Sequence, residues 1–163
     1  MMGRALLIVG WLATLGLGVA GFLGYSSTRA SPMMTPHILI AFASSLLLLF
    51  SHCWIMFYLI GTGKAIREAV EEYDLEPEMV EKTKAYKSDS YPWLMLAMGM
   101  IIATFVLGGG AYSGAIGSWM HHALFYLTAG VQVWTLLIEG RVLLSNERLM
   151  NEINRRAASI TAA

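Results

Sequence analysis

The stretch HILIAFASSLLLLFSHCWIMFYLI, residues 37–60, decides the fold of this chain. It contains no Asp, Glu, Lys or Arg, and its two histidines are His37 and His52. About 20 apolar residues in a helix cross the ~30 Å hydrocarbon core of a bilayer. Thr35 and Pro36, directly before it, indicate a helix start with Thr35 as the cap and Pro36 in the first turn. The sequence therefore predicts a transmembrane helix that begins with a histidine.

Three further stretches meet the same criterion, residues 5–24, 93–112 and 119–138, and none contains Asp, Glu, Lys or Arg. The chain of 163 residues is 56% hydrophobic and 13% charged, with a mean hydropathy of +0.58, which is too apolar for an ordinary soluble domain. We therefore expect an all-α fold, a four-transmembrane-helix bundle forming one integral membrane domain over residues 1–163. No internal repeat is evident in the sequence.

The first span has an alternative interpretation as a signal peptide. Arg4 would supply the basic start, and Gly18-Val19-Ala20 would be an acceptable cleavage site. We interpret residues 5–24 as a retained first helix.

Basic residues in the short loops predict the orientation of the bundle. They precede span one, fill the loop between spans two and three (residues 61–91) and follow span four (residues 139–163). The other two loops hold only Arg29. We therefore expect both termini and the loop 61–91 to be cytoplasmic, in a multi-pass protein of the bacterial inner membrane.

The cytoplasmic segments are expected to be helical. Residues 64–73 and 78–87 each place apolar side chains at helical spacing, and residues 142–156 of the tail do the same. Residues 74–77, Asp-Leu-Glu-Pro, interrupt the loop between its two short helices. The apolar faces of these segments are suited to packing against a partner subunit of a membrane complex or against the membrane interface. The alternative is that these segments are charged helices exposed to solvent.

Three histidines begin two of the spans: His37 opens the second, and His121 and His122 follow the start of the fourth. With the predicted orientation all three lie at the outer membrane face. Histidine is costly in lipid and is usually functional there. Two imidazoles from facing helices are the axial ligands of a low-spin haem b, and we expect His37 and His121 to be that pair. His122 lies about 100° around the helix from His121 and is the second choice.

Two alternatives to haem remain open at this stage. The first is a copper or zinc site that uses the imidazoles of His37, His121 and His122. The second is a cofactor-free bundle in which the histidines serve packing and hydrogen bonding. A haem attached through cysteines is excluded within this chain, because Cys53 is its one cysteine.

A polar stripe follows span four at spacings of three and four residues: His121, Phe125, Thr128, Gln132, Thr135 and Glu139. This spacing keeps the six on one helix face, which in a bilayer turns toward other helices. His52 lies ~22 Å along its helix from His37 and is too deep to share one iron with it. The stripe and His52 are candidates for a proton path that starts at Glu139; the simpler interpretation pairs Glu139 with Arg141.

The remaining motifs and charges exclude several functions. The formal net charge of zero gives no reason to expect nucleic acid. Phosphate-binding glycine loops, zinc-protease helices and Gly-x-Ser-x-Gly elbows are absent from the sequence. A chain this small is not expected to be a stand-alone enzyme.

In outline, the four spans with histidines at one face resemble the small cytochrome b-type membrane anchors of respiratory complexes. The resemblance covers architecture only and assigns no residue. We expect a subunit of a larger redox complex that transfers electrons through one haem b, to or from quinone. A cofactor-free structural subunit and a proton-conducting subunit are the alternatives.

Overall fold

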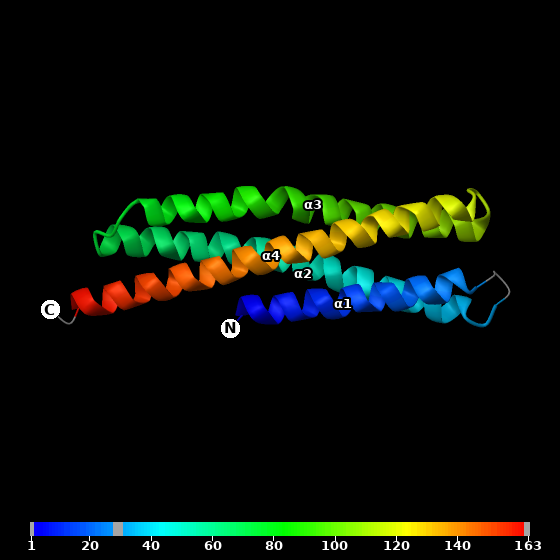
Figure 1. Cartoon of the computed structure of the whole chain (residues 1–163), viewed down its shortest axis with the longest axis horizontal. Helices are drawn as coiled ribbons and strands as arrows, with labels where there is room; N and C mark the ends of the chain where they lie inside the picture. Colours follow the sequence, from blue (N-terminus) through cyan, green and yellow to red (C-terminus); the bar gives the residue numbers. More distant parts are fainter. Residues whose placement is uncertain (1, 28–30, 162–163) are drawn as a thin grey trace.

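The computed structural model describes residues 2–27 and 31–161, and within them all regular structure is α-helical. Arg29, which entered the orientation prediction, lies outside the described residues. The helices are α1 (Met2–Tyr25), α2 (Met34–Glu72), α3 (Glu78–Ser113) and α4 (Ser118–Thr161). They run side by side along one long axis, and α1 begins well short of the end where α4 finishes (Figure 1). The predicted all-α four-helix architecture is confirmed.

Each of the four described helices is long and apolar enough to cross a membrane. Their most apolar stretches have mean hydropathies of 2.2, 2.1, 2.0 and 1.3 in chain order. Many large apolar side chains are exposed around the bundle, among them Phe22, Phe57, Val106 and Tyr126. Apolar side chains on the outside of the bundle are consistent with a lipid bilayer as its surroundings.

Three helices continue far beyond their apolar spans. The expected short helix at residues 78–87 and the span at residues 93–112 are one helix, with Pro92 inside it. Proline removes one backbone donor, but a helix held on both sides by neighbours tolerates the loss. The predicted cap is wrong: α2 starts at Met34 without a side-chain cap bond, although Pro36 does lie in its first turn.

We call the end of the bundle that contains His37, His121 and His122 the histidine end, and the opposite end the terminal end. At the terminal end α2, α3 and α4 form a small core of their own, and its buried members are Ile66, Val70, Met79, Leu149 and Ile153. The apolar faces of the loop and the tail therefore pack against each other. The members of this core are covered within the chain, while Leu144 of the tail is exposed.

An ion pair fastens the end of α4 to the turn between α2 and α3. Both Glu76 carboxylate oxygens accept bonds from Arg156 Nη1, at 2.7 and 2.6 Å. The hydrogen bond from Arg156 lowers the pKa of Glu76 below its ordinary value.

This pair predicts a pH-dependent tail. A depressed folded-state pKa contributes stability above the unfolded pKa, which is lost as pH falls through the folded value. We expect the protection factors of amide hydrogens in the last turns of α4 to fall below about pH 4. Glu76→Gln should show the lower protection factors already at neutral pH. Equal exchange in both proteins at neutral pH would contradict the prediction. The effect is small because both side chains are largely exposed.

The bundle consists of two related helical hairpins, α1–α2 and α3–α4. A shift of 84 residues carries Gly24 onto Gly108 and His37 onto His121. The same shift superimposes buried positions of α2 and α4, namely Ser44 on Thr128, Leu48 on Gln132, Ser51 on Thr135, His52 on Leu136, Ile55 on Glu139 and Leu59 on Leu143. We call this correspondence the repeat: it is a burial pattern shared by the two hairpins, and few residues are identical at the offset of 84.

Candidate functional site

The two histidines that the repeat relates face each other across the bundle. The imidazole rings of His37 on α2 and His121 on α4 have centroids 6.4 Å apart and an interplanar angle of 76°. Both side chains are half-buried. The expectation that the two residues lie at one depth therefore holds in the structure.

Each of these histidines is bound to the backbone of its own hairpin. His37 Nδ1 lies 2.7 Å from the carbonyl oxygen of Ala20, and His121 Nδ1 lies 3.1 Å from that of Thr104. Both partners are 17 residues earlier in the chain. A carbonyl oxygen only accepts, so each Nδ1 carries the proton and donates it. In the neutral ring this leaves Nε2 with a free lone pair, the usual state of a metal-ligating histidine.

Glycines make room for both rings. A Cβ added to Gly24 would lie 2.5 Å from His37 Cε1 and 2.7 Å from its Nδ1. A Cβ added to Gly108 would lie 3.0 Å from His121 Cε1. The repeated unit is therefore a glycine followed thirteen residues later by a histidine whose ring packs against it. Sequence reasoning missed this unit, although Gly24–His37 and Gly108–His121 share it.

These distances predict graded effects of alanine substitutions. Gly24→Ala should push the His37 ring away from Ala20 and lower the free energy of unfolding by about 1–3 kcal/mol, as overpacking does. Gly108→Ala should cost less, because its Cβ meets a looser contact.

The matched control is Gly109→Ala, where an added Cβ meets nothing within 4 Å. It should stabilise α3 by up to about 1 kcal/mol through helix propensity. Thermal unfolding of the detergent-purified proteins measures all three changes. Equal melting temperatures for Gly24→Ala and Gly109→Ala would contradict the packing of His37 on Gly24.

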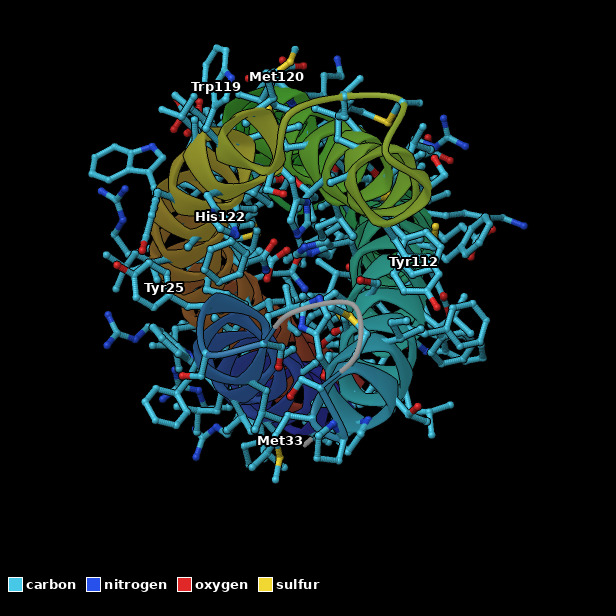
Figure 2. All side chains as sticks on the ribbon, turned by 90° about the vertical axis from the view of Figure 1, so that its right-hand side faces the viewer. Tyr25, Met33, Tyr112, Trp119, Met120 and His122 are labelled. Atoms are coloured by element: carbon cyan, nitrogen blue, oxygen red, sulfur yellow. The ribbon has the colours of Figure 1, made fainter. Side chains whose placement is uncertain are left out.

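His122 points elsewhere. Its ring lies 6.0 Å from the ring of Tyr25 on α1 and 5.9 Å from that of His121. Figure 2 looks onto the histidine end and shows His122 beside Tyr25, between α4 and α1. In the described part of the chain, no group of three or more His, Cys, Asp or Glu side chains is arranged to hold a metal ion. The three-histidine copper or zinc site therefore gains no support.

His52 belongs to a separate cluster deeper in the bundle. Its Nδ1 lies 2.6 Å from Glu139 Oε1, and its Nε2 lies 3.2 Å from Gln132 Oε1 and 3.1 Å from Gln132 Nε2. All three side chains are fully buried. Because both ring nitrogens are engaged, His52 has no free lone pair for an iron.

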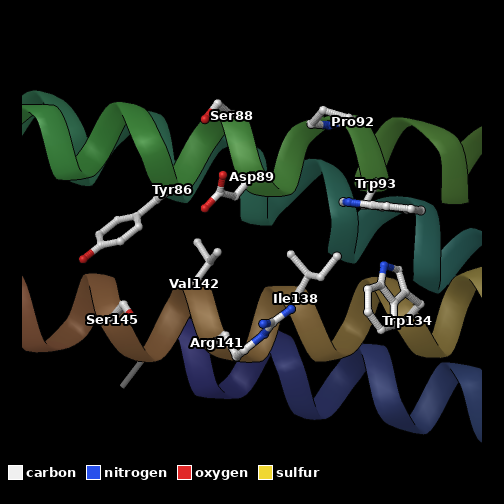
Figure 3. Close-up of a pocket in the computed structure, with 10 residues that line it drawn as sticks. All are labelled: Tyr86, Ser88, Asp89, Pro92, Trp93, Trp134, Ile138, Arg141, Val142 and Ser145. Atoms are coloured by element: carbon white, nitrogen blue, oxygen red, sulfur yellow. The ribbon is translucent and has the colours of Figure 1, made fainter.

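The structure corrects the expected pairing of Glu139 with Arg141. Glu139 bonds to His52 inside the bundle, whereas Arg141 is exposed. Arg141 lines a groove of about 510 Å³ between α3 and α4, together with Asp89, Trp93 and Trp134 (Figure 3). Of the histidine-end and stripe residues predicted from the sequence, none lines this groove.

The rest of the polar stripe also faces the interior. Thr128 is 3% exposed and shares a 2.6 Å hydrogen bond with Thr104 on α3. Thr135 is fully buried and donates to the carbonyl oxygen of Trp93 over 3.4 Å. Phe125 is half-buried and lies against Gly21, where an added Cβ would overlap its ring. The stripe therefore contacts α1, α2 and α3.

Comparison of the chain with protein-family models, with curated proteins and with solved structures finds no match.

Proposed function

We propose that this chain binds one haem b between α2 and α4, with His37 and His121 as the axial ligands, and transfers electrons within a membrane complex. The observation that carries the proposal is the pair of facing imidazoles whose Nδ1 atoms both donate to backbone carbonyls. Such a hydrogen bond fixes the ring and makes its Nε2 a better ligand. The bound iron would supply one-electron redox chemistry.

The separation of the rings supports a shared iron. A nitrogen ligand lies about 2 Å from a metal ion, so two imidazoles on opposite sides of one ion have centroids about 6 Å apart. The observed 6.4 Å is compatible with this value, and it equally fits a direct edge-to-face contact between the two rings. The glycine behind each ring limits its movement away from that position. His37 and His121 would hold the iron, while Ala20 and Thr104 would set the orientation of the two rings.

The distribution of basic residues supports an orientation with the histidine end outside and the terminal end in the cytoplasm. In this arrangement the haem would lie near the outer face of a bacterial inner membrane. We propose quinone as the electron donor or acceptor, and other membrane subunits as the neighbours of the exposed apolar helix faces.

The test is an optical spectrum of the protein purified from its native membrane. Reduction with dithionite should produce the absorption bands of a b-type haem, and electron paramagnetic resonance of the oxidised protein should give a low-spin bis-histidine signal. A short-chain quinol should reduce the same bands. A native complex that contains the full-length chain but no haem would refute the proposal and favour a cofactor-free structural subunit.

A further inference from the structure

We propose that His52 and Glu139 form a buried proton-binding site, which protons reach from the histidine end and which is closed toward the terminal end. This site lies apart from the proposed haem ligands and does not depend on a haem being bound. Its ligand is a proton, held by an imidazole and a carboxylate that share one hydrogen bond.

The cluster holds ionisable groups where the fold does not need them. His52 and Glu139 are both 0% exposed, and Glu139 Oε2 is a buried oxygen without a hydrogen-bond partner. Buried polar atoms without partners are uncommon and require an explanation. The repeat places Leu136 and Ile55 at the corresponding positions, and both are buried. Leu136 and Ile55 therefore show that apolar side chains can fill these positions. Packing alone does not explain why His52 and Glu139 occupy the corresponding positions.

The cluster can satisfy two protonation states. With a neutral imidazole and an ionised Glu139, His52 Nδ1–H donates to Glu139 and Nε2 accepts from the amide nitrogen of Gln132 at 3.1 Å. After it gains a proton, Nε2–H can donate to the amide oxygen of Gln132 at 3.2 Å. A small rotation of one amide therefore serves both states. The added proton belongs on Nε2, because an O–H at Glu139 Oε2 would find no acceptor.

Polar groups connect this site with the histidine end. His121 donates to the carbonyl of Thr104, and the Thr104 hydroxyl bonds to Thr128. Gln132, the next member of the chain, lies four residues after Thr128, about 6 Å along the helix. From Gln132 the bonds continue to His52 and Glu139. One water molecule can bridge a gap of this length between polar groups. A second is needed between His121 and the Thr104 hydroxyl, because the Thr104 carbonyl oxygen only accepts and cannot pass a proton on.

The opposite direction is closed by apolar side chains. Beyond Glu139 the next buried polar residue on α4 is Asn146, about 10 Å further along. The intervening layer belongs to a buried apolar cluster that contains Ile55, Leu59, Leu94, Val142 and Leu143. An apolar constriction without water blocks proton movement.

Tyrosines pack against this apolar layer. They are Tyr58 from α2, and Tyr86 and Tyr91 from α3, while α1 contributes Leu6 and Leu7. The charged side chains of Asp89 on α3 and Arg141 on α4 line the outer groove that Ile138 and Val142 border. The nearest ion pair at the terminal end, Arg4 with Glu147, joins α1 to α4 beyond Asn146 and is exposed on the arginine side.

Proton permeability of liposomes containing the purified protein tests the site and its closure. Wild type should retain a pH gradient. Leu143→Ser and Leu59→Ser, at repeat-related positions in the apolar layer, should each admit water and dissipate the gradient. Adding Glu139→Gln to Leu143→Ser should abolish that leak. The matched control is Leu48→Ser, a fully buried leucine on the histidine-end side of His52, which should not leak.

Three outcomes would overturn the proposal. A leak that persists in Leu143→Ser/Glu139→Gln would show that protons bypass Glu139. Leakage through Leu48→Ser equal to that of Leu143→Ser would show general loosening of the bundle. Folded Leu59→Ser and Leu143→Ser proteins that both hold the gradient would show that no path reaches the layer.

A second measurement addresses the protonation states directly. Nitrogen chemical shifts of ¹⁵N-histidine-labelled protein in nanodiscs should show His52 changing from the neutral to the doubly protonated ring as pH falls. The His52 signals are assigned by their loss in His52→Leu. In Glu139→Gln the doubly protonated form should be lost. A His52 ring that stays in one state over the whole pH range of the folded protein would overturn the proposal.

Discussion

Replacing either His37 or His121 with alanine is expected to abolish haem binding altogether. Each side chain supplies one of the two axial nitrogens in the proposed site, and no described third His, Cys, Asp or Glu completes a ligand group there. Loss of one ligand leaves the iron with a single imidazole and an open position. The measurement is the haem-to-protein ratio of the purified variants, from the reduced spectrum and the protein concentration.

Two histidine controls make this test specific. His122→Ala removes an imidazole at the same end that packs against Tyr25, and haem content should stay at the wild-type level. His52→Leu removes a deeper histidine whose two nitrogens are already engaged, and haem should again be retained. A folded His37→Ala protein with full haem content would show that the ligands are wrongly assigned. The variant His37→Met should retain part of the haem binding, because a thioether is also a haem ligand.

The sequence predicts the four helices well, because a long apolar run without charges has few alternatives to a membrane helix. It predicts their ends less well. From the sequence, residues 78–87 and 93–112 are expected to be separate helices, since Pro92 lies between them and disfavours a continuous helix, whereas the structure has one helix. In the structure the neighbouring helices hold α3 together on both sides of the proline, and this contribution is invisible in the local sequence.

The site was only partly predictable, for a different reason. Helical spacing correctly predicted that Thr128, Gln132, Thr135 and Glu139 face the interior. It does not predict which helix supplies the partner, so Glu139 was assigned to the nearby Arg141 when its partner is 87 residues away. The repeat escaped notice because most related positions share burial and not identity.

The second large effect concerns the buried pair. His52→Leu alone should lower the free energy of unfolding by about 3–5 kcal/mol, because it leaves Glu139 buried without a counter-charge. Glu139→Ile alone should be less damaging, since a neutral histidine keeps its bond to Gln132. Denaturation in mixed micelles measures both changes.

The double variant His52→Leu/Glu139→Ile should recover most of the lost stability. The other half of the molecule already buries Leu136 and Ile55 at the corresponding positions. Replacing a buried ion pair with apolar side chains of similar volume is often neutral or stabilising by about 1–4 kcal/mol. The control is Thr62→Val/Asn146→Leu, which removes another polar contact between α2 and α4 and should change stability by only about 1 kcal/mol.

A double variant as unstable as His52→Leu would mean that the pair is required by the fold. Recovery of stability in the double variant, together with absence of the proton leak when Leu143→Ser is added to it, would separate the two roles. The bundle would then be held together by its apolar layers, and the histidine–glutamate pair would be present at a cost to stability, because it holds a proton that leucine and isoleucine cannot.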